Sequence, residues 1–161
     1  MNQNLKEAFW RQFGASIDAL ENAVKMCPAE VWDNERKFWY NAYHGVFWLD
    51  YYLTLEPANF APPEPFSFSE FEDVLPERTY TKDEILAYLG FAREKCRASV
   101  SGLTDEIAEQ RWVNEHVNYS VLEILLNNMR HTQHHAAQLT MILRQEINDA
   151  PEWVAQTKID L

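Results

Sequence analysis

The segment Ser120–Ile147, SVLEILLNNMRHTQHHAAQLTMILRQEI, carries the clearest helix signal in the chain. It opens with a capping box, because Ser120 and Glu123 are spaced so that each side chain can bind the backbone amide of the other. Apolar residues then recur every three or four positions, as one buried helix face requires. These residues are Val121, Leu125, Met129, Ala136, Leu139 and Leu143. Pro151 follows soon after, so we predict a helix that ends near Ile147.

Two histidines share one flank of this predicted helix. His131 and His135 are four residues apart and therefore lie on the same face. His134 is rotated by about 100° from His135 and is expected to face solvent or a neighbouring element. Two imidazoles one turn apart can bind one divalent metal ion. Such pairs also occur on ordinary helix surfaces, so the spacing alone leaves both a metal site and a solvated surface open.

Three further segments have the pattern of long helices. Leu5–Met26 has one apolar stripe, typical of a helix buried on one side. Glu35–Leu55 is apolar and aromatic almost all round, which is typical of a central helix or of one covered by a second subunit. A second capping box, Thr81 and Glu84, opens the next helix, and Gly102 is a plausible terminator.

The connecting segments complete the predicted architecture. Glu56–Tyr80 is a long connection with five prolines and several phenylalanines, expected to be a strap packed on the helices or a lid. Thr104–Gln110 is a short extra helix, and Trp112–Asn118 is an extended loop. The tail Glu152–Leu161, with Trp153, is expected to dock on the helices. The sequence therefore predicts a single all-α domain over residues 1–161, a four-helix bundle with a long connection between helices 2 and 3.

A third ligand for the histidine pair could come from the aromatic helix. His44 lies on a stripe of Glu35–Leu55 together with several aromatic residues. A lone histidine in such a position is more often a hydrogen-bonded core residue, so convergence with the pair is what decides its role. Asn128 and Gln138 lie near the pair and are candidates for orienting the imidazoles, or are ordinary solvent-facing amides. His116 has no partner at a useful spacing and is expected to be exposed.

A site with three histidine ligands would have a defined chemical character. It leaves at least one coordination position for water or substrate, which is the pattern of catalytic rather than structural sites. Imidazole suits Zn and Ni, and also Fe or Cu, so the ligands do not select the metal. The chain has no His-Glu-x-x-His motif, so no general base is indicated.

Composition narrows the classes of partner. The net charge is -11 and the isoelectric point is near 4.8, which disfavours binding to nucleic acids and to anionic membranes. Cys27 and Cys96 form no redox or metal motif and are expected to be reduced, partly buried thiols. No signal peptide is evident, and the longest uncharged aromatic stretch, residues 38–49, is too short to span a bilayer. We expect a cytoplasmic protein.

Two motifs resemble the DinB-like superfamily of four-helix metalloproteins. The first is Ala42–Tyr51, AYHGVFWLDY, which is similar to the family's ligand segment on the second helix. The second is His131–Leu139, HTQHHAAQL, which is similar to the family pattern of His, three residues, His and Arg-Gly-Gln. The resemblance implies a divalent metal, Zn or Ni, bound by His44, His131 and His135. Ala136 and Ala137 replace Arg-Gly, so any family role of that arginine is not carried over.

The resemblance implies a class of function and leaves alternatives open. Relatives include thiol-dependent transferases and isomerases, and homodimers are common among them. A metal-dependent hydrolase or thiol transferase that acts on an unknown small molecule is therefore expected. The acidic chain offers no obvious clamp for an anionic thiol, which mildly favours hydrolysis or an unassigned reaction. The alternatives are a non-catalytic stress-response protein that binds a metal or ligand, and a helical protein whose histidines have only a structural role.

Overall fold

The computed structural model describes residues 1–161 and is mostly helical, which confirms the all-α class. The long helices are α1 (Gln3–Met26), α3 (Phe38–Tyr52), α5 (Lys82–Gly102) and α7 (Val121–Ile147). The short elements are α2 (Ala29–Trp32), the 3-10 turn η1 (Pro57–Asn59), α4 (Ser69–Glu72), α6 (Asp105–Glu109) and the strands β1 (Arg111–Val113) and β2 (Asn118–Ser120).

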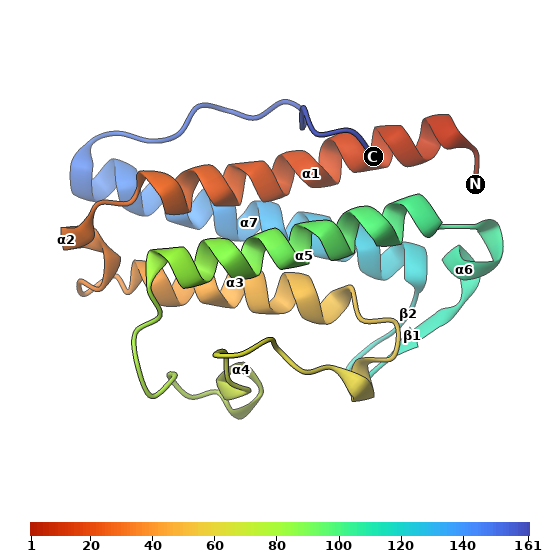
Figure 1. The fold of residues 1–161 in the computed structure, drawn as a ribbon, viewed down its shortest axis with the longest axis horizontal. Helices are drawn as coiled ribbons and strands as arrows, with labels where there is room; N and C mark the ends of the chain where they lie inside the picture. Colours follow the sequence, from red (N-terminus) through yellow and green to blue (C-terminus); the bar gives the residue numbers. More distant parts are fainter.

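The four long helices lie side by side (Figure 1). Helices α1 and α3 each pack against both α5 and α7. Helix α3 is also covered by the connection that follows it, where the ring of Phe66 stacks on that of Tyr43 with 5.8 Å between the ring centroids. The almost uniformly apolar surface of α3 is thus accounted for by burial within one chain.

Local signals set most helix ends. Both predicted capping boxes form, with Thr81 and Glu84 at α5 and Ser120 and Glu123 at α7. Helix α3 begins later than the predicted span, because Lys37 adopts a left-handed backbone conformation (φ 51°) immediately before its first residue, and it also ends earlier, at Tyr52.

A small hairpin replaces the extended loop that was predicted for Trp112–Asn118. Strands β1 and β2 pair antiparallel, with Trp112 opposite Tyr119. Trp112 is fully buried, and its indole Nε1 donates to the carbonyl of Thr54 at 2.8 Å. The side chain of Asn114 accepts from two backbone amides of the turn, which closes the hairpin. The prediction was wrong here because each strand has only three residues, too few to show a clear alternation.

The Pro-rich connection, residues 56–80, is a packed strap along α3, with short elements η1 and α4 (Figure 1). Its side chains Phe60 and Phe66 are buried. Its backbone is also fixed, because the hydroxyl of Tyr43 donates to the carbonyl of Ser67 at 2.7 Å. The expected strap is confirmed, and it places α4 beside His44 of α3.

The C-terminal tail lies along α1 (Figure 1). The backbone amide of Thr157 donates to the carbonyl of Arg11, and the indole of Trp10 donates to the carbonyl of Ile159. Thr157 packs against Gly14, where a Cβ atom would come within 2.5 Å of its methyl group. Trp153 itself is 77% exposed, so the tail docks through Thr157 rather than through this tryptophan.

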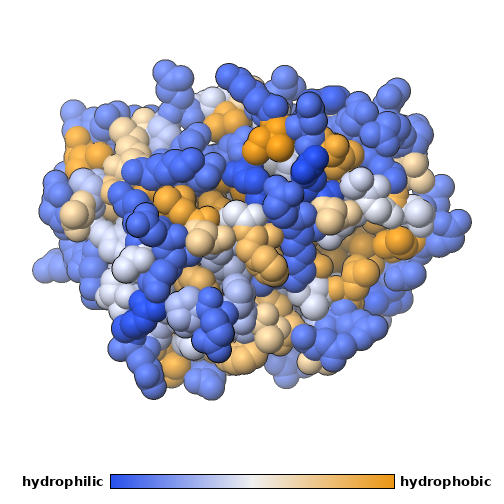
Figure 2. Space-filling model, in the orientation of Figure 1, coloured by the Kyte–Doolittle hydropathy of each residue, from blue (hydrophilic) through white to orange (hydrophobic).

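The face in Figure 2 is largely hydrophilic, with apolar side chains scattered among polar ones. None of the helices combines the length and the apolar character that crossing a membrane requires.

Candidate metal centre

Three histidines from two helices converge between α3 and α7. One ring nitrogen from each of His44, His131 and His135 can be chosen so that all three lie within 4.8 Å of one another. The Nε2 atoms of His131 and His135 are 3.0 Å apart. Two nitrogens on a tetrahedral zinc ion are separated by about 3.3 Å, so the pair is already close to chelating geometry. His134 and His116 are exposed, as predicted.

Close packing of the two helices brings the rings together. Gly45, next to His44, faces α7, and a Cβ atom at this position would lie 3.2 Å from the Cβ atom of His135. The same Cβ atom would lie 3.6 Å from Leu20. A side chain here would push α7 away from α3, so the glycine permits the short distance between the helices.

Replacement of Gly45 by Ala is expected to destabilise the fold by about 1 kcal/mol, because crowding against a backbone-anchored Cβ outweighs the gain in helix propensity. Gly90 on α5 is a matched control, since a Cβ atom there would meet nothing within 4 Å. Gly90→Ala should stabilise the protein by about 0.5–1 kcal/mol. Urea unfolding measures the free energy of unfolding of both variants. Equal stabilisation by the two substitutions would show that the contact with His135 is not tight.

A buried carboxylate orients His44. The Nδ1 atom of His44 lies 2.6 Å from Oε2 of Glu70, and the indole Nε1 of Trp48 donates to the same oxygen at 3.0 Å. The Glu70 side chain is only 3% exposed. This bond assigns the proton of His44 to Nδ1 and leaves Nε2 as the nitrogen free to bind a metal. Histidine ligands of metals are commonly oriented by a carboxylate in this way.

Glu70 was not predicted as a site residue. It lies on α4 in the strap, 26 residues after His44, in a segment with no helical or strand periodicity. The phenylalanines around it indicated that the strap packs down. Nothing in the local pattern distinguishes Glu70 from its acidic neighbours Glu64 and Glu72, so only the folded position of the strap identifies it.

Asn128 and Gln138, the two candidates for orienting the imidazoles, lie in different surroundings. Asn128 is fully buried, but its amide donates to the carbonyl of Leu49 at 2.9 Å and so joins α7 to α3. Gln138 is exposed. Its interaction with the ring of His135 raises the pKa of that histidine slightly, against the larger lowering caused by burial. The Nδ1 atoms of His131 and His135 are buried without any partner.

Burial keeps the paired imidazoles neutral. Desolvation, with a smaller contribution from neighbouring histidines, lowers the pKa of His131 to about 4 and that of His135 to about 3. Neutral imidazole is the form that binds metal ions. At neutral pH the pair is therefore already in its ligating state.

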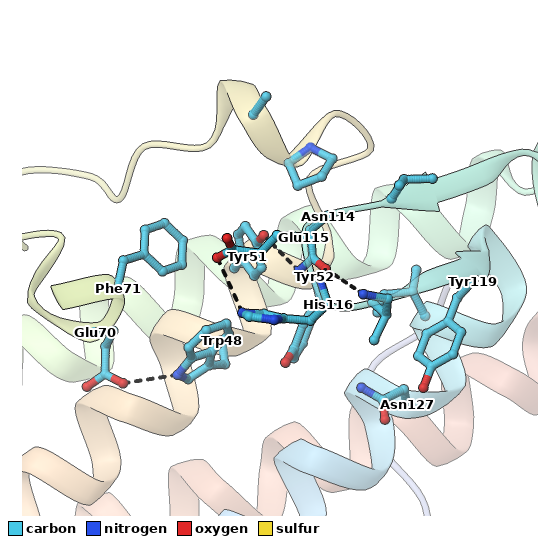
Figure 3. Close-up of a pocket in the computed structure, with 15 residues that line it drawn as sticks. Trp48, Tyr51, Tyr52, Glu70, Phe71, Asn114, Glu115, His116, Tyr119 and Asn127 are labelled. Atoms are coloured by element: carbon cyan, nitrogen blue, oxygen red, sulfur yellow. Dashed lines mark hydrogen bonds and ion pairs between the residues drawn. The ribbon is translucent and has the colours of Figure 1, made fainter. Parts of the chain in front are cut away.

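A pocket of about 740 Å³ lies near this cluster, although none of the three histidines lines it. It is bounded by α3, the strap, the β1–β2 hairpin and the first turns of α7 (Figure 3). Three of its lining residues, Glu70, Trp48 and Tyr52, contact His44 or His131. A small molecule in this pocket would thus lie next to the candidate metal centre.

A scan against protein-family models, a search of curated proteins and a search of solved structures each found no match. The candidate site therefore rests on the geometry of this chain. The three histidines could hold one metal ion.

Proposed function

We propose that this protein is a metal-dependent enzyme of the DinB-like type, with a divalent ion bound by His44, His131 and His135. The observation that carries the proposal is the convergence of three imidazoles from two packed helices on one point. The pairing of the long helices supports a further proposal, that they form the four-helix bundle expected from the sequence.

The residues around the site fit this role. Glu70 holds the tautomer and direction of His44, and Gly45 lets His135 approach α3. Three neutral nitrogen donors suit Zn or Ni, and they leave a position for water or substrate. A bound ion would supply Lewis acidity and lower the pKa of a water or thiol that it binds.

We propose a hydrolytic reaction ahead of thiol transfer. The residues that line the adjacent pocket include no lysine or arginine, which a strongly anionic thiol cofactor would require. The second candidate is a non-catalytic stress-response protein that binds a metal or ligand. It is favoured by one observation: Oε2 of Glu70, the carboxylate beside the histidines, lies against His44 Nδ1 and accepts from Trp48, which is the arrangement of a group that orients a ligand rather than of a general base.

Replacement of Glu70 by Gln is expected to weaken metal binding about 10- to 100-fold, because His44 then loses a charged acceptor for its Nδ1 proton. Glu72→Gln is the matched control, since Glu72 is exposed on the same short helix. Competition with a chromogenic chelator measures both affinities. Identical affinities in the two variants would mean that Glu70 does not support the ligand.

The direct test combines elemental analysis with activity screening. We expect the purified protein to contain about one divalent ion per chain, as three ligands at a single centre imply. Ester, amide and thiol-conjugate panels are then screened before chelation, after chelation and after metal is restored. Turnover that follows the metal content supports an enzyme, and bound metal without turnover supports the second candidate. Protein that neither contains nor takes up a divalent metal would overturn both.

A further inference from the structure

The pocket beside the histidines has a chemical character of its own. Its volume of about 740 Å³ lies within the range of small-molecule sites in proteins. Figure 3 shows Glu70 and Phe71 toward one end, Tyr119 and Asn127 toward the other, and Trp48 and His116 between them. One end of the pocket is thus at Glu70, whose carboxylate contacts His44.

Negative charge dominates the pocket. Its charged lining residues are Glu70 and Glu115, and it has no lysine or arginine. Oε1 of Glu70 is buried without a hydrogen-bond partner. His116 lies 3.3 Å from Glu115, and nearby Arg111 is occupied by the side chain and carbonyl of Asn118. The pocket lining therefore offers no lysine or arginine to an anionic ligand.

Aromatic rings form much of the remaining wall. Trp48, Tyr51 and Tyr52 come from α3, Phe71 from the strap and Tyr119 from β2. Flat apolar groups pack well on such surfaces, and cations are attracted to the faces of tryptophan and tyrosine rings. The combination of aromatic walls and carboxylates is the chemistry that recognises organic amines.

We propose that this pocket binds a small cationic amine that carries a flat apolar group, and that such amines are the substrate class of the site. The assignment of the ligand as substrate depends on the proposed metal-dependent function. Binding of the amine does not, because the pocket's charge and aromatic walls belong to the protein itself.

The test compares two probes that differ mainly in the sign of their charge. Binding of tryptamine and of indole-3-propionate to the full-length protein as purified is measured by isothermal titration calorimetry. At low salt, tryptamine is expected to bind at least about tenfold more tightly, since cation–π and carboxylate attraction both favour it. This preference should shrink as salt is added, because screening weakens interactions at the open rim.

Three variants locate the binding site of the amine. Glu115 is 83% exposed in the hairpin turn, so Glu115→Gln should leave the fold intact and weaken tryptamine binding about two- to fivefold. Glu109→Gln on α6 removes a charge outside the pocket and is expected to leave binding unchanged. Trp48→Phe should weaken tryptamine binding more than indole-3-propionate binding, because the indole ring is the better cation–π partner.

The outcomes separate this proposal from the metal site. Tight, salt-sensitive binding of tryptamine that responds to Glu115→Gln supports it, whatever the metal content of the same sample. Equal binding of the two probes, preference for the carboxylate or no binding of either overturns it. Metal at the histidines without amine binding would leave the proposed function standing and refute only the substrate class.

Discussion

Replacement of His131 by Ala is expected to reduce the metal content from about one ion per chain to nearly none, because two remaining histidines are a weak chelate for a divalent ion. His131 is half-buried on α7, and its Nε2 atom is 3.0 Å from that of His135. Removing it opens space toward Tyr52, whose ring centroid lies 5.8 Å away, without disturbing the fully buried core residues. The helical content should therefore persist.

His134→Ala is the matched control for this prediction. His134 lies on the same helix, three residues later, but is exposed. Elemental analysis and circular dichroism are measured on both variants, and thermal unfolding is followed with and without added zinc. Zinc should raise the midpoint temperature of unfolding of the wild type and of His134→Ala, because a metal that binds only the folded state stabilises that state. It should not raise the midpoint temperature of His131→Ala. Equal metal content in the two variants would show that His131 is not a ligand.

The sequence placed His131 and His135 together because their signal is local, and it offered His44 as a candidate third member. The helical spacing of His131 and His135 placed them on one face, and the unusual position of His44 in an aromatic helix selected it as a third member. The ends of α5 and α7 were predicted because their capping boxes depend on residues only three positions apart.

The remaining features depend on contacts between distant segments. Glu70 reaches His44 only because the strap folds back along α3, and no periodic pattern fixes that path. The direction of the Asn128 side chain does not follow from its closeness in sequence to His131: it faces the backbone of α3 at Leu49. The hairpin escaped prediction because its stability comes from the buried Trp112 and the turn at Asn114 rather than from strand length.

Replacement of Asp50 by Ala is expected to lower the free energy of unfolding by about 2–3 kcal/mol, because it removes a buried carboxylate that accepts from a buried hydroxyl and pairs with a partly buried ammonium. Asp50 is 1% exposed and joins α3 to α5. One carboxylate oxygen lies 2.5 Å from Nζ of Lys95, and the other accepts from the hydroxyl of Tyr88 at 2.9 Å. Burial, together with this carboxylate, raises the pKa of Tyr88, so the hydroxyl stays protonated as a donor. The substitution would leave the hydroxyl of Tyr88 without its acceptor, and the ammonium of Lys95 with only the hydroxyl of Thr54 and the backbone carbonyl of residue 50.

Urea unfolding of three variants separates the ion pair from general packing. Glu94→Ala, in an exposed pair on α5, should change stability by no more than about 0.5 kcal/mol. The double variant Asp50→Ala/Lys95→Met should recover part of the loss, because it removes the unpaired buried charge together with its partner. A loss below about 1 kcal/mol in Asp50→Ala would mean that water replaces the carboxylate easily. Since Asp50 contacts α5 and the histidine site lies between α3 and α7, the folded Asp50→Ala protein should still bind metal, in contrast to His131→Ala.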